Sequence, residues 1–155
     1  MNPQLKFALL IYITNIVVLL VIGLLFEFRP EFFPFHSDVI ETSWKDVELK
    51  YQILYLGMMR TEGAGYLATA TALTILLCIP FLRYEKWSYW AMTTIGFVEH
   101  FPTLAATYHV SSITAASPPW LLSFLLILSL MFAWFLANSG HRKHTCESQV
   151  SSASA

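Results

Sequence analysis

Residues 5–26 read LKFALLIYITNIVVLLVIGLLF, and Lys6 is the only charged residue among them. A helix rises about 1.5 Å per residue and the hydrocarbon core of a bilayer is about 30 Å thick, so this run suits one membrane crossing. The sequence Glu27-Phe28-Arg29-Pro30 follows it and lacks the small residues of a signal-peptide cleavage site. We therefore expect this segment to stay attached as the first transmembrane helix.

Three further apolar stretches have the length of a membrane crossing. None alternates polar and apolar residues as a barrel strand does, and backbone groups in lipid must bond within their own segment, so we predict helices. The expected fold class is all-α, an integral membrane four-helix bundle. Its helices are predicted at about 5–26, 52–82, 87–108 and 119–137.

The predicted helical domain covers residues 1–138 and contains one long connection. This connection, 27–50, is expected to form an extracytoplasmic loop between the first two helices. Residues 139–155 are polar and rich in serine, so we expect a disordered cytoplasmic tail.

The composition excludes several classes of protein. Charged residues make up 12% of the chain and hydrophobic residues 56%, whereas soluble domains carry about 25% charged residues. The net charge of -1 provides no basic surface for a nucleic acid.

The positive-inside rule places both termini in the cytoplasm, and we expect a bacterial inner-membrane protein. The basic residues on the side of the termini are Lys6, Arg83, Lys86, Arg142 and Lys143.

The adjacent pair Glu99-His100 lies near the middle of the third predicted helix. A charge at this depth costs about 2.5–3.5 kcal/mol, so an ionisable residue there indicates a functional site. His100 also belongs to a stripe of small and polar residues spaced by 3 or 4, which predicts one inward-facing side of the helix. This stripe consists of Thr93, Gly96, His100, Thr103 and Thr107.

Other polar residues fall at similar depths or at the extracytoplasmic end of the helices. We interpret them as candidate ligand-binding groups of a polar pocket, although Asn, Ser and Thr also commonly bond between helices without another role. The candidates are Asn15, Arg60, Glu62, Thr69, Thr103 and His109. A face of small residues spaced by 3 or 4 on the second helix is predicted to make close helix contacts. Its members are Gly57, Thr61, Gly65, Ala68 and Ala72.

The long first loop carries five large aromatic residues broken by two prolines. They could lie along the membrane interface, or form a lid over a cavity between the helices. The residues are Phe28, Phe32, Phe33, Phe35 and Trp44.

Zinc would need three or four ligands, and Glu99, His100 and His109 are spread over about 15 Å of helix rise, so we expect neither a metal nor a cofactor.

Three short motifs resemble a pattern in small four-helix bacterial membrane proteins of unknown function, the DoxX-like proteins. They are Gly57-Met58-Met59-Arg60-Thr61-Glu62-Gly63, then Arg83 with Lys86-Trp87-Ser88-Tyr89-Trp90, and Pro118-Pro119-Trp120. The resemblance implies a four-helix bundle and no established activity.

The layout also resembles the EXPERA family, which contains sterol isomerases and the sigma-2 receptor. That resemblance implies a lipophilic cavity with buried acidic residues, and Glu99 and His100 are the counterparts by type. The family's acidic pattern on its second helix is not matched by residues 58–65.

Two functional hypotheses follow from these patterns. In the first, an intramembrane pocket binds a lipophilic small molecule, and Glu99 and His100 act as an acid/base pair in an isomerase or cyclase. In the second, the chain is a non-catalytic accessory subunit of a larger membrane complex. The expected partners are the lipid bilayer, a lipophilic small molecule, and a second copy or another subunit, but no nucleic acid.

Overall fold

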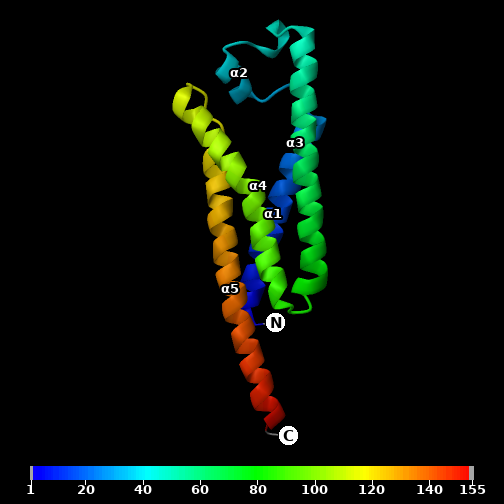
Figure 1. The fold of residues 1–155 in the computed structure, drawn as a ribbon, viewed down its shortest axis with the longest axis vertical. Helices are drawn as coiled ribbons and strands as arrows, with labels where there is room; N and C mark the ends of the chain where they lie inside the picture. Colours follow the sequence, from blue (N-terminus) through cyan, green and yellow to red (C-terminus); the bar gives the residue numbers. More distant parts are fainter. Residues whose placement is uncertain (1, 154–155) are drawn as a thin grey trace.

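The computed structural model of the chain describes residues 2–153 and the side chains of residues 2–141. The described residues are helical and contain no strand. Figure 1 shows the long helices side by side, with a short helical segment above one end. The elements are α1 (Pro3–Phe28), α2 (Pro34–Ile40), the 3₁₀ turn η1 (Trp44–Asp46), α3 (Leu49–Leu76), the π turn η2 (Leu77–Phe81), α4 (Lys86–Ile113) and α5 (Trp120–Ala153).

Among the described residues, three helices are long and apolar enough to cross a membrane. They are Pro3–Phe28, Leu49–Phe81 and Trp120–His141, with hydropathies of 2.8, 1.7 and 2.3. The sequence predicts a fourth crossing in α4, which has sufficient length but is not among these three. Its polar stripe and Glu99 place several polar residues in its central part.

The outward faces of the long helices are apolar. Each carries several large hydrophobic side chains that are exposed on the outside of the bundle, as on a surface in lipid. Examples with more than half of their surface exposed are Phe7, Ile53, Val98, Phe101, Phe132 and Phe135.

Helix α5 extends further than the apolar pattern predicts. The sequence suggests a tail without regular structure from residue 139, whereas α5 continues to Ala153. No proline follows Ala137, and Gly140 alone does not end the helix. Residues 154 and 155 of the predicted tail lie outside the described residues.

The four long helices form a ring in which α1 packs against α3 and α5, and α4 packs against α5 and α3. Below the middle of the molecule the interior of this ring is filled by large side chains that are almost fully buried. They include Tyr12, Leu19, Leu73, Met92 and Leu130. This half of the bundle is densely packed.

Helices α1 and α3 meet backbone to backbone at Gly63. A Cβ atom on Gly63 would lie 2.9 Å from the backbone oxygen of Gly23 and 2.9 Å from the amide nitrogen of Glu27. The predicted small-residue face does not make this contact, because nothing lies within 4 Å of a Cβ placed on Gly57 or Gly65. The prediction of close contacts at that face is therefore wrong within the described chain, since the face turns outward.

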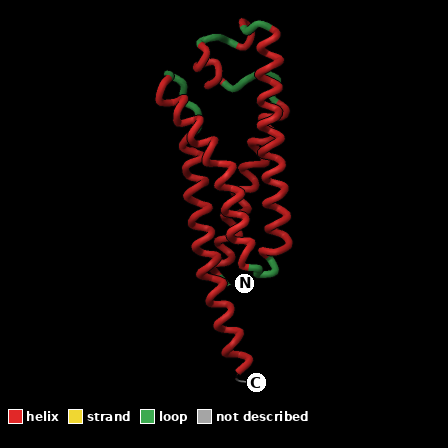
Figure 2. Tube along the Cα trace, viewed as in Figure 1, coloured by secondary structure: helices red, strands yellow, loops and turns green. Residues whose placement is uncertain are grey.

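The upper half of the molecule is more open than the lower half. Figure 1 shows α3 and α4 close together at their lower ends and diverging upward, with α2 above the space between them. Pro102 lies within α4 and has no amide to donate to the carbonyl of Val98, which permits the helix to bend there. Figure 2 shows that the long loop between α1 and α3 lies at this upper end.

Candidate functional site

A cavity of about 480 Å³ lies at the upper end of the four long helices. This volume is within the range of sites that bind small organic molecules. Its walls come from the last turns of α1, residues 55–66 of α3, the second half of α4 and the first turns of α5, and α2 forms its roof. Most of the lining is apolar: Ile22, Leu25, Phe26, Phe33, Phe35, Val39, Ile40, Tyr55, Ala106, Val110, Pro118, Pro119, Leu122 and Leu126.

His100 is the most deeply buried polar side chain of this lining, with 2% of its surface exposed. Its Nε2 atom has no hydrogen-bond partner among the described residues. A buried polar atom without a partner costs about 1–3 kcal/mol, and native proteins rarely leave one unpaired. The predicted stripe of α4 faces the interior, because Gly96 lies against Leu130 and both Thr103 and Thr107 line the cavity with His100.

A second polar group of the cavity comes from α3. The hydroxyl of Tyr66 donates a hydrogen bond of 3.1 Å to Oε1 of Glu62. The same hydroxyl lies 3.4 Å from Oγ1 of Thr103 on α4. Glu62, Tyr66 and Thr103 all line the cavity, so this network connects the α3 wall with the α4 wall.

Glu99 lies outside the cavity lining, although it is adjacent to His100 in the chain. Successive residues of a helix point about 100° apart, and the carboxylate of Glu99 is directed toward α3. Its Oε2 accepts a hydrogen bond of 2.8 Å from Oγ1 of Thr69. Thr69 and Glu99 thus connect α3 and α4, whereas His100 faces the cavity.

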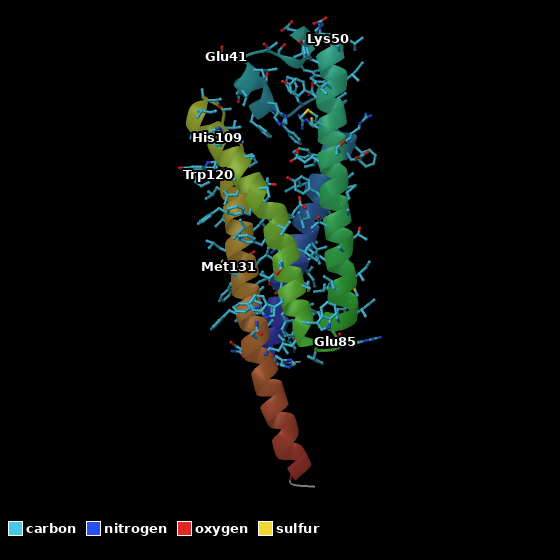
Figure 3. The ribbon with its side chains drawn as sticks, in the orientation of Figure 1. Glu41, Lys50, Glu85, His109, Trp120 and Met131 are labelled. Atoms are coloured by element: carbon cyan, nitrogen blue, oxygen red, sulfur yellow. The ribbon has the colours of Figure 1, made fainter. Side chains whose placement is uncertain are left out.

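Asn15 is a contact between helices rather than a lining residue. It donates to Oγ of Ser129 at 3.0 Å, which connects α1 to α5. Arg60 and His109 are exposed and are not among the lining residues. Figure 3 places His109 near the upper end of α4, close to the start of α5 at Trp120. Of the six predicted ligand-binding residues, Glu62 and Thr103 line the cavity.

The roof is formed by part of the aromatic loop. Phe33 and Phe35 line the cavity, which is the arrangement expected of a lid, while Phe28 is 75% exposed. Phe32 anchors the start of the roof: it is buried, with its ring centroid 4.8 Å from that of Trp44 and 5.8 Å from that of Tyr55.

His36 of the roof also faces the cavity. Its Nδ1 accepts a hydrogen bond of 3.3 Å from the amide of Phe33, which requires that this nitrogen be unprotonated. Burial lowers the pKa of His36 below its ordinary value of 6.5. The closed roof therefore favours a neutral imidazole.

Two lining residues, Tyr66 and His36, are not among the site residues predicted from the sequence. Tyr66 follows Glu62 by four residues, a spacing that places both on one face of a helix and could have indicated the pair. His36 reaches the cavity only because the loop folds back over the helices, which no local pattern specifies.

No protein-family model matches the chain, and comparisons with curated proteins and with solved structures likewise give no match. Among the residues with described side chains, no group of three or more His, Cys, Asp or Glu residues could hold a metal ion. The chemistry of the cavity is that of imidazole, carboxylate and hydroxyl groups in an apolar enclosure.

Proposed function

We propose that the chain is an integral membrane protein whose four long helices form a transmembrane bundle with both termini in the cytoplasm. The apolar outward faces and the three long apolar helices support membrane insertion. The distribution of Lys and Arg supports the orientation. The resemblance to DoxX-like proteins favours a bacterial inner membrane.

We further propose that the cavity binds a lipophilic small molecule. The observation that carries this proposal is the buried Nε2 of His100, which lies at the wall of an apolar cavity without a protein partner. A ligand bearing one hydrogen-bonding group would satisfy this atom while its hydrocarbon part filled the remaining space.

Acid/base isomerisation or cyclisation of the bound molecule is the activity that these groups favour. Removal of a proton at one carbon and its return at another moves a double bond without a cofactor. His100 and Glu62 line the same cavity, so we assign the proton transfers to them, with Glu99 holding α4 against α3. This assignment replaces the pair Glu99 and His100 suggested by the sequence.

Native mass spectrometry of gently solubilised protein tests the binding proposal. The wild type is compared with His100→Leu, which keeps apolar bulk at the wall but has no hydrogen-bonding atom. We expect a discrete lipophilic molecule, identified by solvent extraction, on the wild type and at least about tenfold less of it on the variant.

His109→Leu is the matched control, because it removes an exposed imidazole from the same helix. It should retain the molecule at the wild-type level. Equal retention by all three proteins would contradict the role of His100, and a stably bound protein partner with no small molecule would favour an accessory subunit.

A further inference from the structure

The wall of the cavity carries one acidic residue and no basic Lys or Arg residue. Glu62 is the only carboxylate among the lining residues, and none of them is Lys or Arg. A ligand with a carboxylate head would therefore meet a negative charge and no compensating cation among the lining residues. This composition disfavours anionic ligands.

The carboxylate of Glu62 has unused acceptor capacity. An ionised carboxylate offers about four acceptor positions, and Tyr66 supplies one hydrogen bond. No ion pair involves Glu62 among the described side chains. Arg60 is two positions along the helix, so it points in a different direction and does not neutralise this charge within the cavity.

Tyr66 holds Glu62 in place. Its ring is 4% exposed and packs edge-on against Phe26, with ring centroids 5.8 Å apart. Its hydroxyl lies between the Glu62 carboxylate and Oγ1 of Thr103. Thr103 also donates to the backbone oxygen of Glu99 at 3.1 Å, and the Tyr66 hydroxyl is closer to Glu62, at 3.1 Å, than to Thr103, at 3.4 Å. The acceptor at this wall is thereby oriented before any ligand arrives.

We propose that Glu62, positioned by Tyr66, forms a head-group subsite that accepts a hydrogen bond from the hydroxyl or ammonium group of a lipophilic ligand and excludes carboxylates. This inference rests on the proposed function, because it assumes that the cavity binds a lipophilic molecule. His100, buried and unpartnered in the same cavity, provides the second polar contact.

Four probes of equal chain length test the subsite: 1-dodecanol, dodecylamine, dodecanoate and dodecane. Each is added singly to the full-length protein in a neutral detergent at pH 7.5, and bound adducts are counted by native mass spectrometry. In the wild type we expect dodecanol or dodecylamine to give at least about tenfold more adduct than dodecanoate or dodecane.

In Glu62→Gln we expect the ratio of dodecanol adduct to dodecanoate adduct to fall to below about threefold, because the charge that repels dodecanoate is removed. Tyr66→Phe keeps the ring packing and should give an intermediate ratio, which maintains the test if Glu62→Gln does not fold. If the wild type binds more dodecylamine than dodecanol and Glu62→Gln does not, the ligand is attracted by the charge of the carboxylate. If the wild type binds dodecanol and dodecylamine equally, the ligand is held by the hydrogen bond to the carboxylate.

Two results would overturn the subsite while leaving the binding function intact. One is binding of dodecanoate or dodecane as strong as that of dodecanol in the wild type. The other is a result in which Glu62→Gln and Tyr66→Phe both prefer dodecanol to dodecanoate as strongly as the wild type does, while His100→Leu binds none of the four probes. Failure of all four probes to bind would instead contradict the proposed function and the subsite together.

Discussion

Single glycines on α3 differ sharply in their surroundings, although the sequence makes them look equivalent. Gly63 has backbone atoms of α1 on its face, while Gly57 faces open space. We expect Gly63→Ala to lower the free energy of unfolding by about 1–3 kcal/mol, because rigid backbone must move to admit the new methyl group. Thermal unfolding in detergent, followed by circular dichroism, measures the change.

Gly57→Ala is the matched control, and it should leave stability unchanged or raise it by up to about 1 kcal/mol through helix propensity. Equal stability of the two variants would contradict the close α1–α3 contact.

His36 gives the roof a pH dependence. The unpacked side chain takes up its proton near pH 6.5, whereas the packed one does so only at lower pH. The open form thus binds more protons below pH 6.5, so the packing of α2 is fully stable above that pH and weakens as the pH falls. Hydrogen exchange of residues 33–43, corrected for intrinsic rates, should show more protection at pH 7.5 than at pH 5.5.

His36→Leu should remove this pH dependence, and His109→Leu should preserve it. The titratable residues that line the cavity together with His36 are Tyr55, Glu62, Tyr66 and His100, and Arg29 lies over the ring of Phe33 at 4.6 Å. A pH dependence that persisted in His36→Leu would assign the effect to one of these groups instead.

The sequence predicts part of the site at the level of residues. The spacing of the α4 stripe places His100 and Thr103 on the inner face because helix periodicity alone decides it. The same periodicity does not predict whether Glu99 lines the cavity or contacts α3, since both lie on the inner side of α4. That choice depends on Thr69, whose hydroxyl binds the Glu99 carboxylate.

At the scale of elements, Pro102 connects the shape of α4 to the cavity. Pro102→Ala restores an amide that can donate to the carbonyl of Val98, which should straighten α4 and bring its upper half toward α3. We expect a higher unfolding temperature and at least about threefold lower retention of the lipophilic ligand, because less space remains for it.

The measurement combines thermal unfolding with native mass spectrometry of the same preparation. Ala105→Leu, a change at an exposed position of α4 outside the cavity lining, is the control and should affect neither property. If Pro102→Ala retained as much ligand as the wild type, the bend of α4 at Pro102 would not be what makes room for the ligand.

The long helices are predictable from their apolar runs, but their ends are not. The sequence predicts the start of α3 within a few residues, at about 52 instead of Leu49. It predicts the end of α5 near residue 137, because the apolar pattern stops there, whereas the helix continues without a proline to interrupt it. The position of α2 over the cavity depends on contacts such as Phe32 with Trp44, which join residues from separate elements.

At the scale of the whole molecule, the proposed topology can be tested by cysteine labelling. In a Cys78→Ser, Cys146→Ser background, Lys45→Cys should react with a membrane-impermeant maleimide in intact cells. Lys86→Cys, an equally exposed lysine position at the other end of the helices, should react only after the membrane is permeabilised. Reaction of both in intact cells would contradict two ends on opposite sides of a membrane.

The uneven filling of the helix ring has a consequence for sensing. The half of the bundle near the termini holds large buried side chains such as Tyr12, Leu73 and Met92, whereas the cavity lies in the half beside the roof. In the proposed orientation a molecule in the cavity lies at the depth of the outer leaflet, so we expect it to exchange with that leaflet. Occupancy of the cavity would then follow the composition of that leaflet, and the protein would distinguish the two faces of a bilayer.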